Sequence, residues 1–210
     1  MVEVHADTKS QMLARMLLAQ SITALEVFLS DSLIVTVANS PHAQGKLLAS
    51  KDIGIGSKQI RLSDAVGVED FATTALLEYL RAVSFHELKK ANAFYRVGLG
   101  FNILPEADSL EAIQRFTRMR HDCVHKNGVD RESGELHQID QESLLQLTNE
   151  LSKMVESVDE NVENCSPPPV IFLPIAFRQL RLPIAFRKFT FFSNAIHNLF
   201  RRANTFVLQY

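Results

Sequence analysis

Three side chains near residue 120 are of types that together could cut RNA. Arg120, His121 and His125 lie close in sequence, and the two histidines are four residues apart, which places them on one side of a helix. A neutral imidazole could take the proton of a ribose 2′-hydroxyl, and an imidazolium could protonate the 5′-oxygen leaving group. A guanidinium suits phosphate geometry and stabilises charge on its oxygens. The set predicts metal-independent cleavage of a phosphodiester.

The position of Arg120 on its helix needs an explanation. Helical periodicity places it inside one apolar stripe, formed by Leu110, Ile113, Phe116, Cys123 and Val124. A buried guanidinium without a partner would cost roughly several kcal/mol. The stripe could line a cleft between two copies of the chain. Alternatively, the Arg120 side chain extends to solvent along the stripe, or it pairs with a carboxylate such as Glu26 or Asp122.

The spacing of Arg120 and His125 also bears on oligomeric state. Five residues of helix turn the two side chains about 140° apart. They meet around one phosphate if the last turn before Gly128 is loosened, or if a second copy across a two-fold axis supplies the opposite residue. The sequence favours a homodimer.

The same residues allow two other interpretations. His121 and His125 have the spacing of a zinc pair, with Cys123, Glu135 or His137 as further ligands. Cys123 beside His125 could be a nucleophile, but its position on the apolar stripe predicts an inert, core-facing thiol. We expect neither a metal nor a cofactor.

The periodicity predicts an all-α bundle of about five helices. They are expected over residues 10–39, 68–83, 84–100, 108–127 and 140–164. Pro41 should end the first helix, and the stretch from there to about residue 62 is expected to be a loop. Its glycines at residues 54 and 56 fit neither the Walker phosphate-binding loop nor the dinucleotide-binding fingerprint.

Helix starts are predicted from polar caps. Ser84 and Glu87 form the pattern of a capping box, Asp108 or Ser109 should cap the motif helix, and Asp140 should cap the last helix.

The chain divides into an acidic body and a basic tail. Residues 1–164 are the expected helical domain, with 16 basic and 24 acidic residues, and residues 165–210 have six basic and no acidic residues. The prolines at 167–169 mark the boundary. The tail holds eight of the 14 phenylalanines, so residues 189–207 could form an amphipathic helix on a membrane or a partner. We favour an appendage that covers apolar surface of the body.

Composition narrows the functional classes. The acidic body argues against broad electrostatic capture of nucleic acid, although a local site could bind RNA. Two cysteines give no disulfide framework, and the N-terminus lacks the pattern of a signal peptide, so we expect a cytoplasmic protein. The apolar run at 170–177 is too short to cross a bilayer, so stable membrane insertion is not expected.

The residues resemble the signature of the HEPN family, in which an Arg and a polar residue precede a His near a helix end. Here Arg120, His121 and His125 are followed by Lys-Asn-Gly. The long first helix, the stretches 83–90 and 99–103 before the motif helix, and the closing helix also agree. The likeness covers roughly residues 10–160.

The resemblance implies an all-α fold that dimerises through the motif helices, with Arg120 and His125 catalytic and His121 at the polar position. Asn or Asp is common at that position, so His121 is a departure. Many HEPN proteins are metal-independent endoribonucleases of toxin–antitoxin, phage-defence or RNA-processing systems. The leading hypothesis is such an enzyme, with RNA as substrate and an antitoxin or regulatory protein as a possible partner. The alternatives are an inactive HEPN module that binds a protein or nucleotide, and a membrane-associated helical protein.

Overall fold

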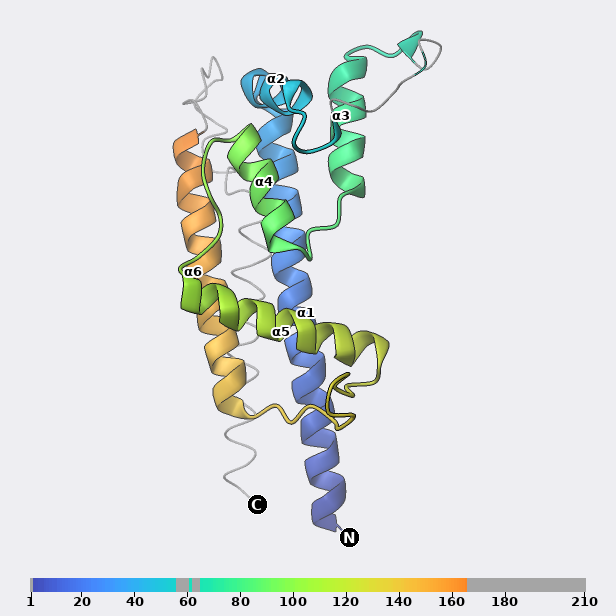
Figure 1. The fold of residues 1–210 in the computed structure, drawn as a ribbon, viewed down its shortest axis with the longest axis vertical. Helices are drawn as coiled ribbons and strands as arrows, with labels where there is room; N and C mark the ends of the chain where they lie inside the picture. Colours follow the sequence, from blue (N-terminus) through green and yellow to red (C-terminus); the bar gives the residue numbers. More distant parts are fainter. Residues whose placement is uncertain (1, 56–60, 62–64, 166–210) are drawn as a thin grey trace, which may run out of the picture. The chain divides into compact units, whose positions relative to one another are not determined.

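The computed structural model describes residues 2–55, 61 and 65–165, and within them the fold is all-α, as predicted (Figure 1). Six helices follow one another: α1 (Val2–Ala38), α2 (Pro41–Ala49), α3 (Phe71–Ala82), α4 (Leu88–Gly98), α5 (Ala107–His125) and α6 (Gln141–Cys165). The predictions about the tail fall on residues 166–210, which lie outside the described residues.

The loop expected after Pro41 was wrong, because Pro41 begins a further helix, α2, within the described residues. Ser40 has extended backbone, and its side-chain oxygen accepts a hydrogen bond from Ala43 N at 3.2 Å. Proline is well suited to the first helical position, where its missing N–H leaves no bond unmade. Ser40 and Pro41 thus begin α2 where a loop was expected.

Two of the predicted helix starts were also wrong. Ser84 does not cap α4, which begins at Leu88 after Glu87, and no side-chain cap is formed there. Helix α5 begins at Ala107, before Asp108 and Ser109.

The predicted cap of the last helix is confirmed. Asp140 Oδ1 accepts a hydrogen bond from Ser143 N at 2.7 Å, directly before α6. This bond holds the pKa of Asp140 below its ordinary value, because it stabilises the ionised carboxylate.

The chain forms two compact units, and α1 and α6 each contribute to both. The motif unit comprises residues 2–25 and 105–155. It contains α5, and Figure 1 shows α5 oriented crosswise to α1 and α6. Its most deeply buried apolar residues are Leu18, Ile22, Leu25, Ile113, Phe116, Ile139, Leu147, Leu151, Met154 and Val155.

The second unit, which we call the aromatic unit, comprises residues 26–104 and 156–165. Helix α2 packs against α3 and α4. A Cβ at Gly98 of α4 would lie 3.1 Å from Leu47 Cγ of α2, so glycine permits the close approach of these two helices. The Phe94 ring lies within 6.3 Å of Tyr79 and 6.4 Å of Phe85, centroid to centroid, in tilted contacts.

One segment of α1, Lys9–Ala38, is long and apolar enough to cross a membrane by length and composition. The core helix of a soluble protein has the same length and composition, so this segment alone does not indicate a membrane span. Leu18, Leu25 and Leu33 of this segment are buried within the protein.

Candidate functional site

The inner face of α5 differs from the predicted apolar stripe in its last turn. Ile113 and Phe116 are buried as expected, but Val124 is 53% exposed. Asp122 is buried instead, with 6% of its surface exposed. The stripe therefore ends in a carboxylate, and the reason lies in the residues that follow α5.

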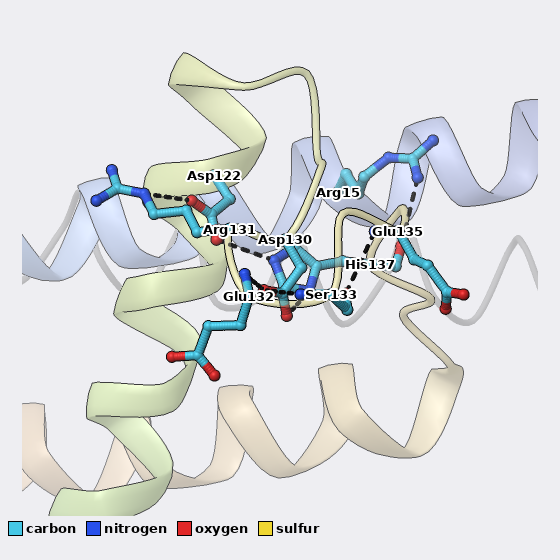
Figure 2. Close-up of polar contacts among 8 residues, drawn as sticks. All are labelled: Arg15, Asp122, Asp130, Arg131, Glu132, Ser133, Glu135 and His137. Atoms are coloured by element: carbon cyan, nitrogen blue, oxygen red, sulfur yellow. Dashed lines mark hydrogen bonds and ion pairs between the residues drawn. The ribbon is translucent and has the colours of Figure 1, made fainter.

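Asp122 is the centre of a charged network (Figure 2). Its Oδ1 accepts a hydrogen bond from Arg131 Nε at 3.2 Å, and His137 Nε2 lies 3.2 Å from its Oδ2. A carboxylate only accepts, so this contact requires the proton of His137 to be on Nε2. The two partners compensate the cost of burying the carboxylate.

The segment after α5, residues 126–140, is called the motif loop. It reverses direction at once, because Asn127 (φ 57°) and Gly128 (φ 85°) both adopt left-handed backbone. The Asp122 carbonyl accepts hydrogen bonds from Lys126 N at 2.9 Å and Gly128 N at 3.0 Å. Asp122 thus holds the loop through its backbone and its side chain.

Hairpin-like bonds fix the rest of the motif loop. His137 N donates to Gly128 O at 2.9 Å, and Asp130 N donates to Glu135 O at 2.8 Å. Asp130 Oδ1 accepts from Glu132 N at 2.7 Å, and this bond is the main reason that the pKa of Asp130 lies below its ordinary value. His137 is brought between Asp122 and Asp130, with its Nδ1 4.0 Å from Asp130 Oδ2.

Helix α1 clasps the motif loop. Gln11 exchanges two hydrogen bonds with the backbone of Ile139, at 3.0 and 3.3 Å, and Arg15 Nη1 donates to His137 O at 3.3 Å. A Cβ at Gly128 would lie 2.6 Å from Arg15 Cδ, so any other residue here would require the Arg15 side chain to shift.

The two candidate histidines are brought together on the surface. The rings of His121 and His125 are exposed, with centroids 4.6 Å apart. Desolvation and then the positive charge of Arg131 hold the pKa of His121 below its ordinary value, with smaller contributions from His125 and Arg120. A lowered pKa favours the neutral imidazole, which is the form that can act as a base.

Arg120 directly precedes His121 in α5, and its side chain is half-buried. It is thus less accessible than the exposed ring of His125.

The other interpretations of these residues gain no support. Within the part of the chain that the structure describes, no group of three or more His, Cys, Asp or Glu residues could hold a metal ion. Burial raises the pKa of the Cys123 thiol, which disfavours the nucleophilic thiolate.

Helical periodicity predicts neither the position of Arg131 nor the burial of Asp122, and the sequence suggests only a possible zinc ligand at His137. All three meet through a loop closure, which helical periodicity does not report. The available signal was Asn127-Gly128, since this pair favours an immediate turn that brings the following residues back toward α5.

Comparison of the chain with protein-family models, curated proteins and solved structures gave no match.

Proposed function

We propose that this protein is a metal-independent endoribonuclease of HEPN type. The observation that carries the proposal is the contact of the His121 and His125 rings, exposed at the end of α5, with centroids 4.6 Å apart. Two imidazoles at this separation lie close enough to serve the two ends of one phosphodiester.

The reaction needs one base and one acid. His121, whose pKa is lowered by desolvation and by Arg131, takes the proton of the ribose 2′-hydroxyl. The 2′-oxygen attacks phosphorus, the bond to the 5′-oxygen breaks, and His125 protonates that leaving oxygen. The products are a 2′,3′-cyclic phosphate and a 5′-hydroxyl. DNA has no 2′-hydroxyl, so the mechanism itself selects RNA.

Arg120 supplies positive charge to the phosphorane oxygens in this proposal. Because Arg120 and His125 are about 140° apart around an ideal helix, a homodimer in which each copy contributes one of them is the simplest arrangement. The exposed apolar side chains Met12, Met16 and Val124 of the motif unit suit such an interface.

The test is cleavage of single-stranded RNA in the presence of EDTA by wild type, His125→Ala and Arg120→Ala. The matched control is His42→Ala, an exposed histidine of α2 in the aromatic unit. We expect activity in wild type and the control, and a loss of about 100-fold or more in His125→Ala. Equal cleavage by all four proteins would indicate a contaminating nuclease and remove the proposal.

The second candidate is an inactive HEPN dimer that binds a partner protein, such as an antitoxin, or a nucleotide. The same exposed apolar residues of the motif unit favour the protein-binding form. This module would form a dimer that His125→Ala leaves unchanged, measured by light scattering, and its overproduction would not arrest growth. Growth arrest that disappears in His125→Ala would favour the enzyme.

A further inference from the structure

The guanidinium of Arg131 is held in a way that leaves its outer edge available. Its Nε bonds Asp122 Oδ1 at 3.2 Å, and the Arg131 side chain is 52% exposed while the Asp122 side chain is 9% exposed. Figure 2 shows the two terminal amino groups of Arg131 turned away from this carboxylate. Asp122 therefore fixes the guanidinium through Nε and leaves its two terminal amino groups for another acceptor.

This guanidinium is anchored to the helical turn that carries the histidine pair. Around an ideal helix, His125 lies about 40° from His121 and about 60° from Asp122, and so between them. Arg120 lies about 100° from His121 on the other flank. The anchor of Arg131 is thus on the His125 side of the pair, the side from which Arg120 is turned away.

The electrostatics of His121 support the same placement. After desolvation, the charge of Arg131 is the largest influence that lowers the pKa of His121, and it exceeds the influence of Arg120. The arginine of the motif loop therefore acts on His121 more strongly than the arginine of the helix.

We infer that Arg131 is a phosphate-binding residue of the candidate site, and that its two outer amino groups contact non-bridging oxygens of an RNA phosphate beside His121 and His125. This inference rests on the proposed function. Arg131 would stabilise the negative charge of the phosphorane within a single subunit, a role that the helical position of Arg120 makes difficult without a second copy.

Arginine is suited to this role in a way that lysine is not. Its planar fork can bond Asp122 with Nε and a phosphate with both terminal amino groups at once. Because Asp122 is buried and also bound by His137, the guanidinium is oriented before the substrate arrives. Such preorganised donors lose little freedom when charge develops on the phosphate.

The first experiment compares RNA cleavage by Arg131→Ala and Arg131→Lys with the control Arg81→Ala, an exposed arginine of α3 that removes the same charge from the aromatic unit. Loss of a charge-assisted contact should lower kcat/KM of Arg131→Ala about 10- to 100-fold. Arg131→Lys should remain impaired, and added guanidinium ion should restore activity to Arg131→Ala. A loss no greater than that of Arg81→Ala, or a loss that guanidinium does not reverse, would overturn the inference.

The second experiment separates this inference from the nuclease proposal. It measures binding of a 2′-O-methyl RNA oligonucleotide, which cannot be cut, by fluorescence anisotropy at several salt concentrations. Arg131→Ala should bind more weakly than Arg81→Ala, and the slope of log affinity against log salt should fall by about 0.7. This result supports the phosphate contact even if wild type cuts no RNA. Absence of cleavage by wild type would overturn only the nuclease proposal. Equal binding by the two variants overturns the phosphate contact even if wild type is active.

Discussion

The two units of the protein bury their polar groups in different ways. In the aromatic unit, the buried Tyr95 hydroxyl donates to Leu29 O at 2.8 Å, and buried Asn92 Oδ1 accepts from Ile103 N at 2.8 Å. These partners are neutral. In the motif unit, buried Ser21 also has a neutral partner, the Leu17 carbonyl, but the carboxylate of Asp122 is buried too, and its partners are Arg131 and His137.

The units therefore differ in one buried carboxylate, Asp122, which is held by Arg131 and His137 rather than by neutral groups. Residues 26–104 contain seven aromatic residues and the motif unit contains one, Phe116. Burial raises the pKa of Tyr95 far above its ordinary value, so its hydroxyl remains a donor at any physiological pH. The charges of the motif unit are sensitive to salt, and Asp122 directly follows the candidate histidine His121.

Removing the Asp122 carboxylate should have the largest effect on stability. Asp122→Ala leaves Arg131 and His137 without their shared acceptor, and we expect a loss of about 2–3 kcal/mol in the free energy of unfolding. Urea unfolding measures it. The control Asp108→Ala, at an exposed position in the first turn of α5, should cost less than about 1 kcal/mol. Equal losses would mean that the network does not stabilise the motif unit.

Gly128→Ala tests the clasp between α1 and the motif loop. We expect a loss of about 2 kcal/mol, because alanine must adopt left-handed backbone and also displace Arg15. Gly134 has φ 72° and open space at its Cβ, so Gly134→Ala should cost only the backbone part, about 1 kcal/mol.

The excess at Gly128 should disappear in a background that carries Arg15→Ala. Thermal denaturation gives this comparison for wild type, Gly128→Ala and Gly134→Ala, each with and without Arg15→Ala. If Gly128→Ala remains more destabilising than Gly134→Ala without the Arg15 side chain, displacement of Arg15 is not the cause of the additional loss.

Tyr95→Phe probes the neutral region and should cost about 1 kcal/mol, the value of one buried hydrogen bond. The loss should be the same in mildly acidic and mildly basic buffer, because the Tyr95 hydroxyl remains protonated over this pH range. RNA cleavage per folded molecule should not change. A loss that varies with pH over this range would contradict the assignment of neutral, pH-independent contacts around Tyr95.

The smallest expected effect is a shift in the titration of His121. Desolvation and Arg131 lower its pKa, so the neutral imidazole should persist as pH falls below histidine's ordinary value. If His121 is the base of the proposed nuclease, RNA cleavage should fall only as pH passes below this lowered pKa. Arg131→Ala should move this titration to higher pH. Imidazole NMR signals followed against pH give the measurement directly, with Arg81→Ala as the variant that should leave the titration in place.

The sequence predicted the helices whose signals are local. Asp140 could be recognised as the cap of α6, because its partner Ser143 is three residues away. Helix α2 was missed because Pro41 was interpreted only as a stop. The candidate histidines could also be found from their spacing within one helix.

The remaining parts of the candidate site depend on contacts across the chain. Asp122 looks like a surface residue in sequence, and it is buried only because the loop returns Arg131 and His137 to it. Val124 looks like a core residue, but it is exposed. Periodicity assigns faces to a helix, and it does not report what a following loop places over them.

The clasp on the motif loop also bears on how the chain folds. Its hydrogen bonds join Arg15 to His137, 122 residues later, and Gln11 to Ile139, 128 residues later. Contacts of such long range require a large loop to close before they return any free energy, and they form slowly. During synthesis on the ribosome, the amino-terminal turns of α1 therefore cannot make these contacts until residue 139 has been added, and the histidine pair gains its supported geometry only after that point.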